Sequence, residues 1–112
     1  MIHTRENQID DAFFALSHPV RRGIVEKLAK GDLSVADVSC DFSESPSQIT
    51  KHLHILERAG MLSREKKGRV HQLHFEPEPL EEMMVWVSRY QSFWEDRFDA
   101  LENFLHKTSE ET

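Results

Sequence analysis

Cysteine is almost missing from this chain of 112 residues, which contains only Cys40. One cysteine cannot form a disulfide or a redox pair within the chain, and it suits a reducing compartment. Long apolar runs are missing as well, whereas a membrane span needs about twenty apolar residues. The start of the chain, MIHTRE, has no apolar signal core. We therefore expect a cytoplasmic protein with no membrane association.

Catalytic and metal-binding motifs are also missing. The sequence has no glycine-rich phosphate loop, nucleophile elbow, CxxC or HExxH. Of its seven histidines, His52 and His54 lie about 200° apart around a helix and cannot share an ion within one chain. His71 and His74 are three apart on a predicted strand and point to opposite faces. The sequence predicts no enzyme, no cofactor and no metal site within one chain; a zinc site shared across a dimer stays open as an alternative.

Acidic residues are scarce only in the middle of the chain. The net charge is −6, yet residues 43–75 carry six lysines and arginines against three acids, which gives +3. Residues 76–112 carry three basic residues against ten acids, which gives −7. A basic segment between acidic ends is compatible with nucleic-acid binding, since phosphate contacts require only a local positive field.

Helix signals organise the first half of a single domain, residues 1–112. Pro19 suits the first turn of a helix, and Gly31 suits the residue just after its end. Ser34 and Asp37 are spaced as a helix cap. The predicted helices span residues 8–17, with Ile9, Phe13 and Leu16 on the apolar stripe, then 19–30, 34–42 and 45–59.

The helix over 45–59 has the clearest start. Ser45-Pro46-Ser47-Gln48 places serine at the cap, proline at the first helical position and glutamine where a capping box has its partner. Two short helices joined by a tight turn at 41–44 form a helix-turn-helix, in which the second helix reads DNA.

The helical period separates the two faces of this predicted recognition helix. Ile49, Leu53 and Leu56 form its buried side. The opposite side and its flanks carry hydroxyl, amide, imidazole and cationic groups without a carboxylate, which suits base edges and phosphates. The candidate DNA contacts on this helix are Ser45, Ser47, Gln48, Thr50, Lys51, His54 and Arg58.

Beyond Gly60 the apolar period changes from helical to two. Residues 61–65 and 70–75 are predicted strands around the basic loop 66–69, so residues 61–75 form a hairpin, or wing. Cations on such a hairpin would lie on phosphates or in a minor groove. The candidate contacts here are Arg64, Lys66, Lys67 and Arg69.

A long final helix is predicted over residues 79–108. Its apolar surface is larger than so small a domain can cover, and the simplest partner is a second copy of the chain. The expected interface residues on this helix are Leu80, Met84, Val87, Tyr90, Trp94, Phe98 and Leu101.

Several segments resemble the ArsR family of bacterial repressors. They are ALSHPVRRGIV from Ala15, LSVADV from Leu33, Ser45–Leu56 with its TKHL, and RAGML from Arg58. The aromatic C-terminal residues, Trp86 among them, are similar to a branch of that family. The resemblance implies a mainly α fold with a small β-hairpin, the winged helix-turn-helix. It also implies a homodimer held by the first and last helices, with Phe13 in the interface, that represses from a short inverted repeat in double-stranded DNA, often in its own promoter. Release by a signal is implied too, and the small-molecule inducer is unknown.

The sequence departs from the metal-sensing members of that family. Ser34 and Ala36 stand where those members carry thiols, and the last helix has one histidine, His106. A metal-responsive repressor would need a histidine site between subunits, which stays as one alternative. The other alternative is a winged helix used for protein contacts, because fold alone does not determine function.

Overall fold

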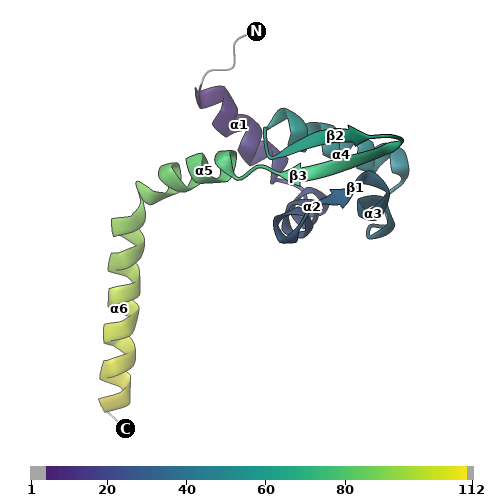
Figure 1. The fold of residues 1–112 in the computed structure, drawn as a ribbon. Helices are drawn as coiled ribbons and strands as arrows, with labels where there is room; N and C mark the ends of the chain where they lie inside the picture. The colour runs from purple at the N-terminus through teal and green to yellow at the C-terminus, as the bar shows by residue number, and fades with distance from the viewer. Residues whose placement is uncertain (1–4, 111–112) are drawn as a thin grey trace.

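The computed structural model describes residues 5–110, which form a small helical body from which a C-terminal helix extends (Figure 1). Most of the chain is helical, with one small antiparallel sheet, so the predicted fold class is confirmed. In chain order the elements are α1 (Arg5–Ala15), α2 (Pro19–Lys30), β1 (Leu33–Ser34), α3 (Val35–Cys40), α4 (Pro46–Arg58), β2 (Leu62–Lys67), β3 (Val70–Phe75), α5 (Glu78–Ser88) and α6 (Gln91–Glu110).

The core lies where α2, α3 and α4 meet the sheet. The helical period of the sequence predicts its buried face on α4 correctly, because apolar residues three and four apart share one side of a helix. Each enclosed side chain of this size contributes roughly 1.5–3 kcal/mol. The large side chains with less than 2% exposure are Ile24, Val38, Ile49, Leu53, Leu56, Met61 and Leu73.

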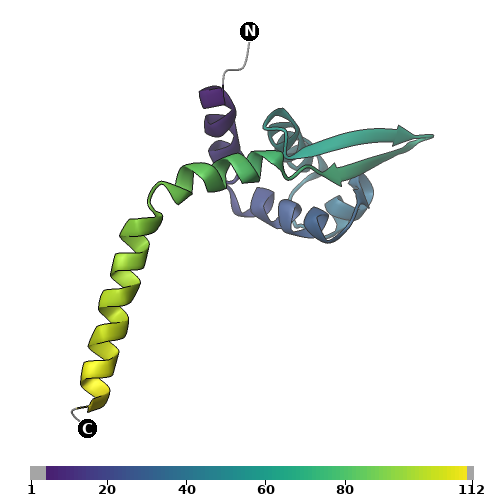
Figure 2. The same cartoon turned by 60° about the vertical axis from the view of Figure 1, so that its left-hand side comes forward.

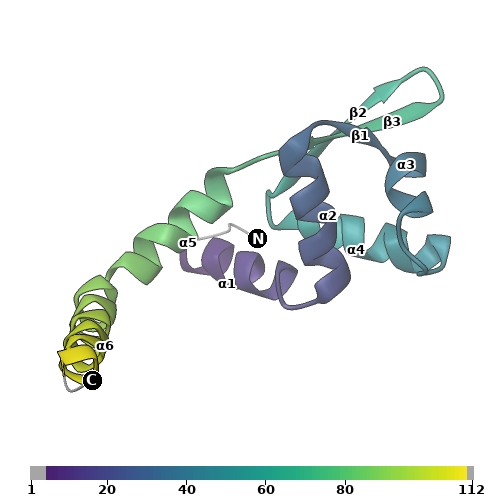
Figure 3. The same ribbon diagram turned by 90° about the horizontal axis from the view of Figure 1, so that it is seen from below.

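α1 packs on the body through small residues of its apolar stripe and beside it. Ala12 and Ala15 are enclosed, whereas Phe13, which the sequence analysis expects in the dimer interface, is exposed. These small side chains let α1 pack closely on α4 and α5, and Figure 3 shows α1 between α5 and the pair α2 and α4. The ring of Phe13 instead meets Trp86 of α5 edge-on, with 5.6 Å between ring centroids.

Helices α2 and α3 begin at polar caps. His18 is the cap of α2: its Nδ1 accepts the N–H of Val20 at 3.1 Å. At α3, Ser34 and Asp37 form both halves of a capping box, as their spacing predicts. α3 ends at Cys40, two residues earlier than predicted. Local hydrogen bonds thus fix the residue at which α3, the first helix of the helix-turn-helix, begins.

The sheet has the order β1-β3-β2, with every pair antiparallel. β1 was not predicted, since a strand of two residues has no readable period. Leu33 of β1 pairs with the enclosed Leu73 of β3. β1 therefore joins the hairpin to the helical body directly before α3.

The loop of the hairpin is shorter than predicted. β2 continues to Lys67, which pairs with Val70, so the loop is Gly68 and Arg69 rather than residues 66–69. Gly68 has a φ of 63°, and no non-glycine residue of the described chain has a positive φ. A positive φ at the first of two loop residues is typical of a type II′ turn. Figure 2 shows the hairpin projecting from the body as an arm.

The predicted final helix over 79–108 is wrong in one respect: it is two helices. α5 ends at Ser88 and α6 begins at Gln91. Between them the N–H of Arg89 bonds to Trp86 O, and that of Tyr90 to Val87 O, which is the tighter i to i−3 pattern. Ser88 Oγ also donates to Val85 O at 2.6 Å. Such a side-chain bond to the preceding turn competes with helical bonding and bends helices.

The bend directs α6 away from the body (Figures 1 and 2). The Cα radius of gyration is 19.3 Å, against about 13 Å for a compact domain of this length. Within residues 5–110, no helix is long and apolar enough to cross a membrane. Because α6 extends away from the body, its apolar side is not covered by the rest of the described chain.

His74 connects all three strands on the outer side of the sheet. Its Nδ1 lies 2.7 Å from Asp32 Oδ2, just before β1, and its Nε2 lies 3.1 Å from Glu65 Oε2 on β2. Only the protonated imidazole can donate to both carboxylates. The hydrogen bond with Asp32 raises the pKa of His74 most, and Glu65 raises that pKa further.

We predict that this link stabilises the fold in acid more than in base. The folded-state pKa of His74 is raised, so its contribution is complete below the ordinary value near 6.5 and is lost as pH rises through the folded-state pKa. The thermal midpoint of His74→Gln should therefore fall below that of the wild type at pH 6, and the gap should narrow at pH 9. Thermal melts followed by circular dichroism measure this gap, with His54→Gln on exposed α4 surface as the matched control. A gap that is constant or wider at pH 9 would contradict the role of His74.

Candidate nucleic-acid interface

The start of α4 determines its register. Ser45 is the N-cap: its Oγ accepts the N–H of Gln48 at 3.3 Å, and Pro46 takes the first turn. Among the described residues, the reciprocal half of a capping box is present at α3, through Asp37, and not at α4. The predicted N-cap of α4 is therefore confirmed. Of the two hydrogen bonds of a capping box, the one from Gln48 N–H to Ser45 Oγ is present.

The two faces of α4 divide as the helical period predicts. Ile49, Leu53 and Leu56 are at most 1% exposed. Ser47, Lys51 and His54, which the sequence placed on the opposite side, are exposed, as are the remaining candidate contacts of this helix. Its solvent-facing side thus offers hydroxyl, ammonium and imidazole groups without a carboxylate.

Some candidate side chains on α4 already have local partners. Thr50 Oγ1 donates to Pro46 O at 2.9 Å, and Ser47 Oγ lies 3.2 Å from Ser45 Oγ. Arg58 lies at the far end of α4, in a hollow that Asp11 of α1 and Glu82 of α5 also line. The structure therefore groups Ser47, Lys51 and His54 and sets Arg58 apart, beside carboxylates.

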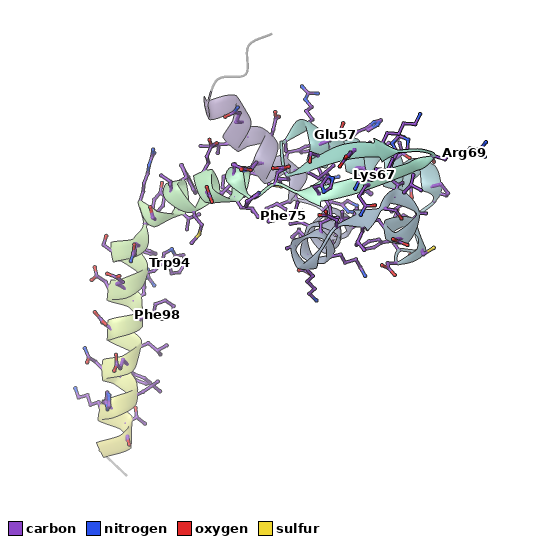
Figure 4. The ribbon with its side chains drawn as sticks, viewed as in Figure 1. Glu57, Lys67, Arg69, Phe75, Trp94 and Phe98 are labelled. Atoms are coloured by element: carbon purple, nitrogen blue, oxygen red, sulfur yellow. The ribbon has the colours of Figure 1, made fainter. Side chains whose placement is uncertain are left out.

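The hairpin carries its cations toward the tip. Figure 4 shows Lys67 and Arg69 at the end farthest from the C-terminal helices. Lys66 is exposed beside them. Arg64 lies nearer the body, and its Nε is 3.3 Å from Glu57 Oε2 of α4. Lys66, Lys67 and Arg69 therefore form the free basic end of the wing, while Arg64 ties the wing to α4.

The structure also accounts for two of the three acids of the basic segment. Glu57 pairs with Arg64, and Glu65 lies beside His74. These two acids thus have a basic side chain next to them, which reduces their repulsion of a phosphate. This neutralisation needs contacts across the fold, so it could not be read from the charge count.

His52 lies in the interior of the fold, between α4 and the start of α2. It is 9% exposed, and its Nδ1 lies 3.1 Å from an Nη of Arg21. Its ring also packs against that of His18 at a tilt of 43°, with 4.5 Å between centroids. Burial lowers the pKa of His52 most, and the charges of His18 and Arg21 lower it further. The sequence analysis missed Arg21, because an arginine on a helix is usually solvated.

The candidate interface residues of the C-terminal helices are largely uncovered. Trp94 and Phe98 project from the same side of α6 (Figure 4) and are 53% and 66% exposed. Phe13, Met84, Val87, Tyr90 and Leu101 are exposed too. Leu80 differs, because it packs against the core of its own chain. The structure thus leaves most of this set available to a partner.

No group of three histidine, cysteine or carboxylate side chains within the described range is arranged to hold a metal ion. Cys40 is exposed, and His106 lies on the exposed surface of α6, 3.7 Å from Glu102. The two nitrogens of His74 face two different carboxylates, so that cluster is a hydrogen-bonded link and not a ligand set.

Comparisons with known proteins agree with this geometry. The family described as "Bacterial regulatory protein, arsR family" matches residues 18–64, from the cap of α2 into β2. The crystal structure of an ArsR family transcriptional regulator is 30% identical, has a TM-score of 0.76, and aligns over 84% of this chain and 97% of its own. The chain belongs to the ArsR family. It is therefore a DNA-binding transcriptional regulator and not an enzyme.

Two relatives from Bacillus subtilis extend the match. The transcriptional repressor SdpR is 29% identical over 82 residues, which are 73% of this chain and 91% of SdpR. The uncharacterized HTH-type transcriptional regulator YuzN is 32% identical over 86 residues, which are 70% of this chain and 94% of YuzN. This chain thus matches nearly the whole length of both relatives.

We predict that the cap of α4 contributes measurably to stability. Ser45→Ala removes the acceptor for the N–H of Gln48 and should lower the free energy of unfolding by about 1 kcal/mol. Ser47→Ala is the matched control, because within residues 5–110 the Ser47 hydroxyl has the Ser45 hydroxyl as its hydrogen-bond partner and caps no backbone N–H. Urea unfolding followed by circular dichroism compares the two variants. Equal losses in both would show that Ser45 is not the cap on which α4 depends.

Proposed function

We propose that this ArsR-family regulator is a homodimeric repressor of an inverted-repeat operator, with an operator in its own promoter. The observation that carries the proposal is the exposed, carboxylate-free side of α4 beside the basic end of the wing. The similarity to SdpR, a transcriptional repressor, supports repression as the output.

In the proposed complex, α4 enters the major groove. Lys51 and His54 are exposed on its outward side and present N–H donors to acceptors on the base edges. Lys67 and Arg69, at the wing tip, contact phosphates or the minor groove, where cations are strongly attracted. The remaining candidate contacts support the same docking, with Ser45, Ser47 and Gln48 at the start of α4.

We propose that the dimer forms through α1, α5 and α6. Aromatic side chains along α5 and α6 are half-exposed or more, among them Tyr90, Trp94 and Phe98. α6 has 20 residues, or about 30 Å of helix, which is too large an apolar side for an isolated monomer to leave in water. A two-fold dimer would place two copies of α4 in successive major grooves, about 34–36 Å apart.

We predict that Lys51→Ala and His54→Ala weaken operator binding without altering the fold. Each lost base contact should reduce affinity about 5- to 150-fold, equivalent to 1–3 kcal/mol. The probe is a duplex selected by the wild-type protein from randomised DNA, and binding is measured by fluorescence anisotropy at several salt concentrations.

The charge-matched control for Lys51 is Lys107→Ala, at the exposed end of α6. Its affinity for the selected duplex should equal that of the wild type. If the wild type retains no duplex at about 50 mM salt, or binds with no salt dependence, DNA recognition by this face is refuted and the protein-contact alternative is favoured.

We predict that Trp94→Ala and Phe98→Ala shift the protein from dimer to monomer. Both remove apolar surface from one side of α6, so the dimer dissociation constant should rise at least tenfold. Sedimentation equilibrium measures the shift, with Glu95→Ala as the neighbouring exposed control. A dimer of unchanged affinity in both aromatic variants would place the interface elsewhere.

A further inference from the structure

A surface cleft of about 270 Å³ lies between the start of α2 and the side of α4. Most of the side chains that line it carry nitrogen atoms, and the carboxylate in its lining belongs to Glu44. Gln48 and Lys51 of this lining are also candidate DNA contacts. The nitrogen-bearing residues of the lining are His18, Arg21, Gln48, Lys51 and His52.

Arg21 brings a buried positive charge to this cleft, with only 6% of the residue exposed. Its Nε donates to Ala15 O at 2.8 Å, and one Nη donates to Phe14 O at 3.1 Å and to Ser17 Oγ at 3.3 Å. The other Nη lies 3.1 Å from His52 Nδ1. These partners are all neutral, so within residues 5–110 the guanidinium has dipoles around it and no carboxylate of its own.

A buried charge held only by neutral groups is costly and gains strongly from an anion. The partners of Arg21 account for four of its five N–H groups. The fifth belongs to the same Nη that donates to His52. Burial lowers the pKa of Arg21, because its charged form has less solvation than it would have in water.

His52 adds a donor to the same cleft. Because Arg21 donates to Nδ1, the neutral ring of His52 carries its proton on Nε2. Burial and the charges of His18 and Arg21 lower the pKa of His52, and Glu44 acts in the opposite direction. The environment of His52 is therefore net positive although Glu44 lines the cleft.

The cleft lies on the flank of α4 that faces away from the wing. At about 100° per residue, Gln48 and His52 lie on one side of the buried residue Ile49, and Glu57 lies on the other. Glu57 pairs with Arg64 of β2, which identifies its side as the wing side. With α4 in a major groove, the wing would approach one bordering backbone and the cleft the other.

We propose that this cleft binds a phosphate of the DNA backbone, with Arg21 as the charged donor and His52 beside it. The proposal rests on the DNA binding proposed above. It assigns a phosphate contact to Arg21, which neither the charge pattern nor the outward side of α4 indicates.

The test is a scan of the selected duplex in which single phosphates are replaced by neutral methylphosphonates. One position should weaken wild-type binding by tenfold or more and have little effect on Arg21→Gln. This variant should also lower the slope of log affinity against log salt by about one. Arg22→Gln is the matched control, since Arg22 is the exposed neighbour and donates to Leu16 O; its slope and scan should equal the wild type.

Suppose that the wild type binds with a steep salt slope, and that every methylphosphonate weakens binding by Arg21→Gln as much as binding by the wild type. The cleft is then not a phosphate site, while the proposed function stands. If the wild type does not bind DNA, the proposed function itself fails.

A wild-type measurement covers the case in which Arg21→Gln does not fold. A bound phosphate should raise the pKa of His52, measured by NMR, when the duplex is added, and the methylphosphonate at the sensitive position should abolish that rise. No rise on DNA binding overturns the proposal. A saturable rise with inorganic phosphate alone, against sodium chloride of equal ionic strength, also overturns it, because the site would then take a free anion.

Discussion

The burial of Ile49, Leu53 and Leu56 sets the rotation of α4 about its axis, and the proposed interface depends on that rotation. Truncating one such leucine to alanine costs about 2–5 kcal/mol, out of a total stability of about 5–15 kcal/mol for a domain. Any other rotation of α4 about its axis would expose these side chains and remove a large part of the stability of the domain. Because these residues face the core, Lys51 and His54 must face solvent, and the flanks of α4 meet the wing on one side and α2 on the other.

A chain of net charge −6 can present a basic surface because most of its acids lie outside residues 43–75 and two of those inside are paired within the fold. Glu57 and Glu65 lie within the basic segment, yet each has a cationic partner inside the protein, Arg64 and His74. His74 can hold both of its carboxylates only while it is protonated, so the attachment of the wing to the body depends on pH. The opposite arrangement occurs at Arg21, whose charge is held by neutral groups and gains from an external anion.

The C-terminal helices follow a different constraint. Leu80 at the start of α5 is covered by the core of its own chain, but beyond the bend at Ser88 the aromatic side chains of α6 have no covering element in the described chain. Without the bend, one straight helix would have continued in the direction of α5. The aromatic pattern predicted an uncovered side on this segment, but it gave no sign of the direction in which that side points.

The sequence by itself determined the positions of α2, α4 and the hairpin, the cap at Ser45, and the outward side of α4. These features follow from local signals in the sequence: a cap bond, a helical period, an alternating strand period and a glycine in a turn. The tertiary structure alone decided which acids are neutralised, that Arg21 is buried, that Leu33 adds a strand, and that α1 packs through its alanines. Those features join residues distant in the chain, such as Arg21 with His52, 31 positions apart, and Asp32 with His74, 42 positions apart. A local pattern carries no information about such pairs, because only the packed fold brings their side chains within hydrogen-bond distance.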